Sequence, residues 1–201
     1  MNKDPSPQSA YSRFLNELHQ KVLHGLAAHE DLDTAADLLL HHPDKVDAHQ
    51  VLAILGDGGA TWHESTVASF LSTPHDPLVA AMAIQVLVCV WSDPLRRYRD
   101  WVLQCIRGLH WDVEQDVRLM AISCAGIYCR RDGDGEVASS LIGIAIHDED
   151  ILFRETAAES LAIAMTEDRT AVYMSSTRRS DAVGWASSIA NQARLRWPEA
   201  T

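Results

Sequence analysis

The chain has 201 residues, and its 28 acidic residues outnumber its 17 lysines and arginines, which gives a formal net charge of −11. Its hydrophobic content of 47% excludes global disorder, and the length suits one compact domain. Because so acidic a chain is poorly suited to neutralise phosphates, the composition argues against a nucleic-acid ligand and favours a basic partner.

The first residues of the chain lack the basic and then apolar order of a secretory signal, so residues 1–8 are expected to form a short frayed lead-in. The longest apolar stretch runs from Leu78 to Trp91 and is interrupted by Gln85. A membrane-spanning helix needs about 20 apolar residues, which makes this stretch a buried helix by expectation. We therefore expect a cytoplasmic protein, bacterial on the hypothesis developed below, with no membrane contact.

Apolar residues recur with the 3.6-residue period of helices along the whole chain. In the first half, helices are predicted at about 9–28, 31–41, 44–55 and 61–72. In the second half, three hairpins are predicted: 76–91 with 94–109, 112–129 with 135–147, and 150–165 with a final helix near 181–196. Residues 167–180 give a weaker pattern, which suggests a short helix near 170–174 and a basic stretch at Arg178–Arg179. No strand pattern appears, so the predicted class is all-α.

Three segments of the second half share one sequence pattern. They start at Val79, Val117 and Phe153, at spacings of 38 and 36 residues. An acidic residue stands three positions before each start, at Asp76, Glu114 and Asp150. A period of this size predicts stacked helical units, none of which buries its apolar face alone.

This pattern resembles that of HEAT repeats, helical hairpins whose first helix opens with an acid, an apolar residue and often arginine, followed by Ala and Leu in the core. The fuller matches are Glu114, Val117, Arg118 and Ala121, and then Asp150, Phe153, Arg154, Ala157 and Leu161. The unit from Asp76 carries Ala80 where arginine is expected. The resemblance covers about residues 43–166, its motif is degenerate, and it brings no catalytic residue with it.

The resemblance implies a right-handed α-α superhelix of HEAT-like hairpins, a single α-solenoid domain over residues 1–201. Its units are expected at about 43–73, 76–109, 112–147 and 150–197. A fold of this kind is expected to act as a partner-binding scaffold. We expect a monomer.

Arg118 and Arg154 each follow an acid by four residues, Glu114 and Asp150 respectively. That spacing predicts an ion pair on one helix face, worth about 0.2–0.5 kcal/mol in isolation. By the HEAT resemblance, each guanidinium could also bridge to the neighbouring repeat. A structural role is therefore expected for both arginines.

Metal and cofactor chemistry find little support. His19, His24 and His29 are five residues apart, a spacing that turns successive rings away from one another on a helix. The run from Asp132 to Glu136 resembles the start of a calcium loop, but the sixth loop position, which requires glycine, holds Val137, and the twelfth, which requires a bidentate glutamate, holds Gly143. The run is predicted to be an acidic solvated turn that caps the next helix. We expect neither metal nor cofactor.

Catalytic signatures are also missing: the sequence has no GxSxG, HExxH, GxxxxGK or GxGxxG motif. The four cysteines lie in apolar helical patterns without a CxxC pair, so they are expected to be reduced core residues. We expect a protein that is not an enzyme and has no catalytic residues.

Acidic residues before the second and third repeat segments are the remaining candidate site. Corresponding loops of stacked hairpins lie along one rim, so the acids of the two loops should meet beside an aromatic residue and form a surface for a cationic partner. An alternative is that these acids only keep the protein soluble. The predicted partner-binding residues are Trp111, Asp112, Glu114, Asp116, Asp148, Glu149 and Asp150.

Small size, strong acidity and the lack of catalytic motifs favour one function, an inhibitor or immunity protein that blocks a toxin or enzyme with a basic surface. A scaffold or regulatory adaptor in a larger complex is the second hypothesis. A third is a helical-repeat DNA glycosylase or chromophore-lyase-like enzyme, with Arg96, Arg97, Arg99 and Arg107, beside Tyr98 and Trp101, as its basic groove.

Overall fold

A computed structural model of the chain describes residues 7–93, 96–166 and 181–200. All regular elements in these residues are helical, and no strand occurs among them, which confirms the all-α prediction within this part of the chain. The chain divides into two compact units, residues 1–92 and 93–201. The division falls inside the repeat unit predicted for residues 76–109. The short helix and basic stretch suggested for 167–180 lie outside the described residues.

The described residues of the first unit, 7–92, form five α-helices, a 3-10 turn and a π-helical segment. Its core is formed by the apolar faces of α2 and α3, which pack on each other, and of α3 and α5. The close approach of α3 to the π-helical segment requires Gly56, because a Cβ there would lie 2.9 Å from Val86 Cγ2. The elements in chain order are α1 Pro7–Leu23, α2 His29–His41, α3 Ala48–Asp57, η1 Thr61–His63, α4 Glu64–Ala68, α5 Pro77–Ile84 and the π-helix η2 Gln85–Val90.

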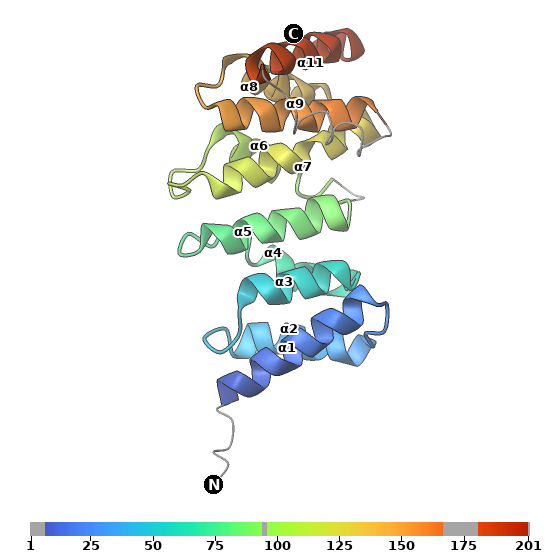
Figure 1. Cartoon of the computed structure of the whole chain (residues 1–201), viewed down its shortest axis with the longest axis vertical. Coiled ribbons are helices and arrows are strands. Elements are labelled where there is room, and N and C mark those ends of the chain that lie inside the picture. Colours follow the sequence, from blue (N-terminus) through green and yellow to red (C-terminus); the bar gives the residue numbers. More distant parts are fainter. Residues whose placement is uncertain (1–6, 94–95, 167–180, 201) are drawn as a thin grey trace. The chain divides into compact units, whose positions relative to one another are not determined.

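The second unit contains α7, α9 and α11 side by side, with α6 and α8 behind them (Figure 1). Helix α7 packs on α6 and α9, and α11 packs on both α8 and α9. The elements are α6 Arg99–Arg107, α7 Asp116–Asp132, α8 Gly135–His147, α9 Ile151–Met165, α11 Ala182–Arg196 and the 3-10 turn η3 Pro198–Ala200.

Helices α7 and α9 run parallel, as two contacts show. The Arg118 guanidinium lies 4.4 Å from the centre of the Phe153 ring near the start of both helices. Further along, the Gly126 amide donates a hydrogen bond to Ser160 Oγ at 2.9 Å. The residue numbers increase together, so the N-terminal ends of α7 and α9 lie at the same end of the unit.

Aspartate caps explain where several helices begin. The Asp76 carboxylate accepts the Val79 amide and Pro77 follows it, which is the helix opening that an Asp-Pro pair favours. Asp47, Asp134, Asp150 and Asp181 cap α3, α8, α9 and α11 in the same way.

Several predicted helix boundaries were wrong. The helix predicted for 9–28, after a lead-in over 1–8, begins at Pro7 and ends at Leu23, and the helix predicted for 44–55 begins at Ala48. The helix predicted for 61–72 is a 3-10 turn followed by α4, which ends at Ala68. The helix predicted from Pro94 begins at Arg99, after a turn in which Arg96 has a positive φ of 54°. The helix predicted from Asp112 begins at Asp116, because Gln115 adopts a left-handed conformation with φ of 60°.

Candidate partner-binding surface

The loops that precede α7 and α9 meet at one end of the second unit, and Arg118 joins them. Its guanidinium donates to Gln115 Oε1, in the first loop, at 2.9 Å, and it forms an ion pair with the Asp148 carboxylate, in the second. The prediction that these two loops lie together therefore agrees with the geometry of the unit.

Arg118 and Arg154, 36 residues apart, make equivalent main-chain contacts. Arg118 Nε donates to the Ile106 carbonyl of α6 at 3.1 Å, and Arg154 Nε donates to the Ala145 carbonyl of α8 at 3.3 Å. Each arginine thus satisfies a carbonyl near the end of the preceding helix, where carbonyls lack helical partners.

The ion pairs predicted within one helix face are not the ones that form. Among the described residues, the ionic partner of Arg118 is Asp148 rather than Glu114. The Asp150 carboxylate accepts the Leu152 amide at 2.8 Å and caps α9 instead of pairing with Arg154. The reason is geometric, since both arginines extend toward the ends of neighbouring helices.

Two of the predicted partner-binding acids hold the loops instead of forming an exposed surface. Asp112 is only 4% exposed, and its carboxylate accepts the amides of Val117 and Arg118 at the start of α7. The Asp148 side chain is 13% exposed, pairs with Arg118 and accepts the Asp150 amide. Removing either carboxylate would disturb the loops themselves.

The other predicted residues remain accessible at this end of the unit. Glu114, Glu149 and Asp150 are exposed, whereas Asp116 and Trp111 are half-buried. Asp150 also caps α9, whereas neither Glu114 nor Glu149 has a capping or core function among the contacts described above. The exposed carboxylates give the surface a negative charge that Arg118, already paired with Asp148, does not offset.

Three apolar side chains lie exposed at the same end of the unit, one in the loop before α7 and two at the start of α9, and the sequence interpretation missed them. Val113 is 79% exposed, Leu152 49% and Ile151 43%. Val113 precedes the first buried residue of α7, and Ile151 and Leu152 precede that of α9. Apolar residues just ahead of the first buried residue of both helices were the signal that could have identified them. We call these three residues, with Glu114, Asp116, Glu149 and Asp150, the acidic end.

A second polar cluster lies inside the second unit. The Asp93 carboxylate is buried and accepts the Tyr128 hydroxyl at 2.7 Å and the amides of Arg97 and Tyr98 at 2.8 and 3.0 Å. Burial, and then the bond to Asp93, raise the pKa of Tyr128 well above its usual range. Every oxygen of this cluster has a hydrogen-bond role within the fold, so the cluster holds the start of α6 against α7.

The acidic turn from Asp132 to Glu136 was predicted to be solvated, but its central carboxylate, that of Asp134, is buried. Asp134 is 7% exposed, caps Val137, and pairs with Arg99 through Nε at 2.5 Å and through a second nitrogen at 3.0 Å. Arg96 also pairs with Asp134, and Arg107 pairs with Glu136. Three of the four arginines that could have lined a basic groove, Arg96, Arg99 and Arg107, are therefore engaged with acids. The capping function predicted for this turn is confirmed.

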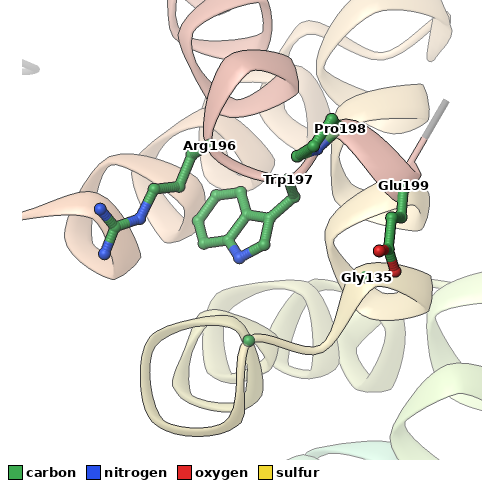
Figure 2. A pocket seen from close by; sticks show the side chains of 6 residues that line it. Gly135, Arg196, Trp197, Pro198 and Glu199 are labelled. Carbon is green, nitrogen blue, oxygen red and sulfur yellow. The ribbon is translucent and has the colours of Figure 1, made fainter.

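A pocket of about 230 Å³ lies beside the C-terminal end of α11. Figure 2 shows the Trp197 indole pointing toward the turn that carries Gly135, between the side chains of Arg196 and Glu199. Ligand pockets usually have volumes of about 300–1,000 Å³, so this one suits at most a small group. The charged residues that line it, Arg196 and Glu199, do not make up the pair of a nucleophile and a general base that covalent catalysis uses.

The thiols and metal-binding side chains of the described residues are not arranged as a reactive site. Burial, and then the charge of Asp112, raise the pKa of Cys105 to about 12, and burial with Asp134 does the same for Cys129. A thiol of that kind is not a nucleophile at neutral pH. No three histidine, cysteine or acidic side chains in this part of the chain are placed to hold a metal ion.

Comparisons of the chain with models of known protein families, with curated proteins and with solved structures gave no match. Among the described helices, none combines the length and the apolar character needed to cross a membrane. The site is thus characterised by its own geometry: two loops, joined by Arg118, that expose carboxylates and apolar side chains together.

Proposed function

We propose that the protein is a non-enzymatic binding protein whose acidic end binds a basic partner protein. The observation that carries the proposal is the exposure of Val113, Ile151 and Leu152 beside the carboxylates of the acidic end, where the two loops are joined by Arg118. Apolar contacts that lose water on binding, surrounded by charges that guide the encounter, are the usual composition of a protein interface. A surface that served only solubility would not need the apolar side chains.

More specifically, we propose an inhibitor or immunity protein that covers the basic surface of a toxin or enzyme. The net charge of −11 supports this function, because a basic partner would be attracted over distances beyond direct contact. The cytoplasm, where such a partner would be neutralised before release, is the proposed location.

We further propose that the second unit is built from HEAT-like repeats. The equivalent bonds of Arg118 to Ile106 and of Arg154 to Ala145 support this, since a repeat predicts the same contact at the same position. On this proposal the loops of the acidic end are repeat-equivalent loops. Their alignment at one rim follows from the stacking.

A photo-crosslinking residue at Val113 tests the proposed function. Expressed in its native host, this variant should crosslink to a basic protein, and a matched variant with the same residue at Ser139, exposed on α8, should not. The captured protein should then bind the purified chain with an affinity that falls as salt is added, because screening weakens charge attraction. Capture of an acidic protein, or equal capture from Ser139, would contradict the proposal.

Co-expression separates an inhibitor from a scaffold. If the captured protein harms growth or has an enzymatic activity, the intact chain should suppress it in proportion to complex formation. A complex that leaves the partner's activity unchanged would favour the scaffold hypothesis.

A further inference from the structure

Trp62, in the first unit, is an exposed aromatic side chain that is held in one orientation. It is 45% exposed, yet its indole Nε1 donates to Asp33 Oδ1 at 2.8 Å. One face of its ring stacks on His29, with the ring centres 4.1 Å apart. A tryptophan fixed in this way loses little conformational freedom on binding, which is the property of an interface anchor.

Asp33 is held from a second side as well. His63 Nε2 lies 2.8 Å from the same Oδ1 atom. Hydrogen bonds from Trp62 and then His63 lower the pKa of Asp33, so its carboxylate remains ionised at neutral pH. The charge lies beside the exposed part of the indole.

The outer face of α2 continues this negative surface. Glu30, Asp33 and Asp37 occupy positions i, i+3 and i+7 and are all exposed, on the face opposite the buried Leu32, Ala35, Ala36 and Leu39. No lysine or arginine occurs between residues 22 and 44. The face therefore carries a stripe of acids from Glu30 to Asp37, next to Trp62 at its N-terminal end.

We infer that the outer face of α2 and Trp62 form a docking surface for a basic amphipathic helix of a partner protein. Arginines or lysines of that helix would pair with Glu30 and Asp37, and an apolar or guanidinium side chain would cover the exposed part of the Trp62 ring. The complementary charge selects this occupant, because an acidic or neutral helix would leave the Glu30 and Asp37 carboxylates facing it without a positive charge to pair with. This surface lies in the first unit and does not depend on the acidic end of the second.

The test uses a synthetic helical peptide with leucine on one face and arginine on its flanks. The indole N–H signals of the six tryptophans are followed by nuclear magnetic resonance while the peptide is added, and Trp62→Phe identifies the Trp62 signal. The Trp62 signal should shift in a saturable manner. Glu30→Lys and Asp37→Lys should each weaken binding by about fivefold or more. The same peptide with glutamate in place of arginine should not bind.

Asp44→Lys is the matched control, because it reverses an exposed acid of the same unit outside this stripe and adds the same charge. It should leave the affinity within about twofold of the wild type. Circular dichroism establishes that each variant keeps its helices. The inference is overturned if the Trp62 signal does not move, or if Asp44→Lys weakens binding as much as Asp37→Lys.

Discussion

Gly126 of α7 lies in direct contact with Ser160 of α9. The Gly126 amide donates to Ser160 Oγ at 2.9 Å, and the Ser160 hydroxyl reaches back to the Ser123 carbonyl at 3.3 Å. A Cβ atom at position 126 would lie 2.4 Å from the Ser160 main-chain oxygen. The two helices that carry the acidic end are therefore packed backbone to backbone, and their spacing fixes how its two loops meet.

Gly126→Ala should destabilise the protein by about 3 kcal/mol, because an added methyl group must displace main-chain atoms rather than a flexible side chain. The free energy of unfolding in urea measures this. Gly143→Ala on α8 is the matched control, since nothing lies within 4 Å of its added Cβ. It should stabilise the protein by up to about 1 kcal/mol. Equal stability of the two variants would show that α7 and α9 do not approach so closely.

Arg118→Ala should cost more stability than Arg154→Ala. Loss of Arg118 removes its bond to Ile106 and leaves the half-buried Asp148 without its ionic partner, which should cost about 2–3 kcal/mol. Loss of Arg154 removes a bond to Ala145, worth about 1 kcal/mol. Thermal or urea unfolding of both variants compares them. A larger loss for Arg154→Ala would contradict the assigned contacts.

Acid should weaken the second unit through Asp134. Burial alone would raise the pKa of this carboxyl group, but Arg99, the Val137 amide and the charge of Arg96 together hold the pKa below its ordinary value of 3.8. A lowered pKa in the folded state means that the ionised carboxylate contributes stability above the unfolded pKa. That contribution is lost as the pH falls through the lower folded pKa.

Asp134→Asn should therefore lose less stability than the wild type between about pH 6 and about pH 3. Urea unfolding at the two pH values measures the difference. Asp44→Asn, which changes an exposed carboxylate, should keep the wild-type pH dependence. An Asp134→Asn variant with the full acid sensitivity of the wild type would show that the Arg99 pair does not lower this pKa.

Much of the helical architecture was predictable from the sequence, because apolar periodicity and capping residues are local signals. Gly135–His147 was predicted with its observed bounds, and the helix from Asp150 only one residue too long at its start. The start of α7 was wrong by four residues, since the left-handed Gln115 and the buried carboxylate of Asp112 depend on contacts with Arg118. Such tertiary contacts leave no local pattern.

That the two loops lie together was predictable from the sequence, but the environment of each acid was not. The spacing of the sequence pattern predicted that the loops containing Asp112–Asp116 and Asp148–Asp150 lie side by side. In the fold, the ion pair between Arg118 and Asp148 joins them. Which acids face solvent could not be read from composition, because a carboxylate that caps a helix and one that binds a partner have the same side chain. The exposed Val113 was overlooked for a similar reason: its exposure depends on the conformation of the loop.

The acids that should be changed to test the acidic end are therefore Glu114 and Glu149, which are exposed, rather than Asp112 and Asp148, which hold the loops. A matched control reverses Glu17 and Asp44, exposed acids of the first unit, and produces the same change in net charge. Any difference between the two double variants then reports on the position of the charges. Circular dichroism should show the same helical content in both.

The most direct measurement is the association rate of the partner crosslinked through Val113, at low and at high salt, with the wild type and both double variants. Glu114→Lys with Glu149→Lys should slow association at low salt by about tenfold or more and reduce its salt dependence, with little change in dissociation. Glu17→Lys with Asp44→Lys should associate at nearly the wild-type rate. Wild-type rates for the Glu114 and Glu149 variant at low salt would contradict the proposal that the acidic end binds the partner.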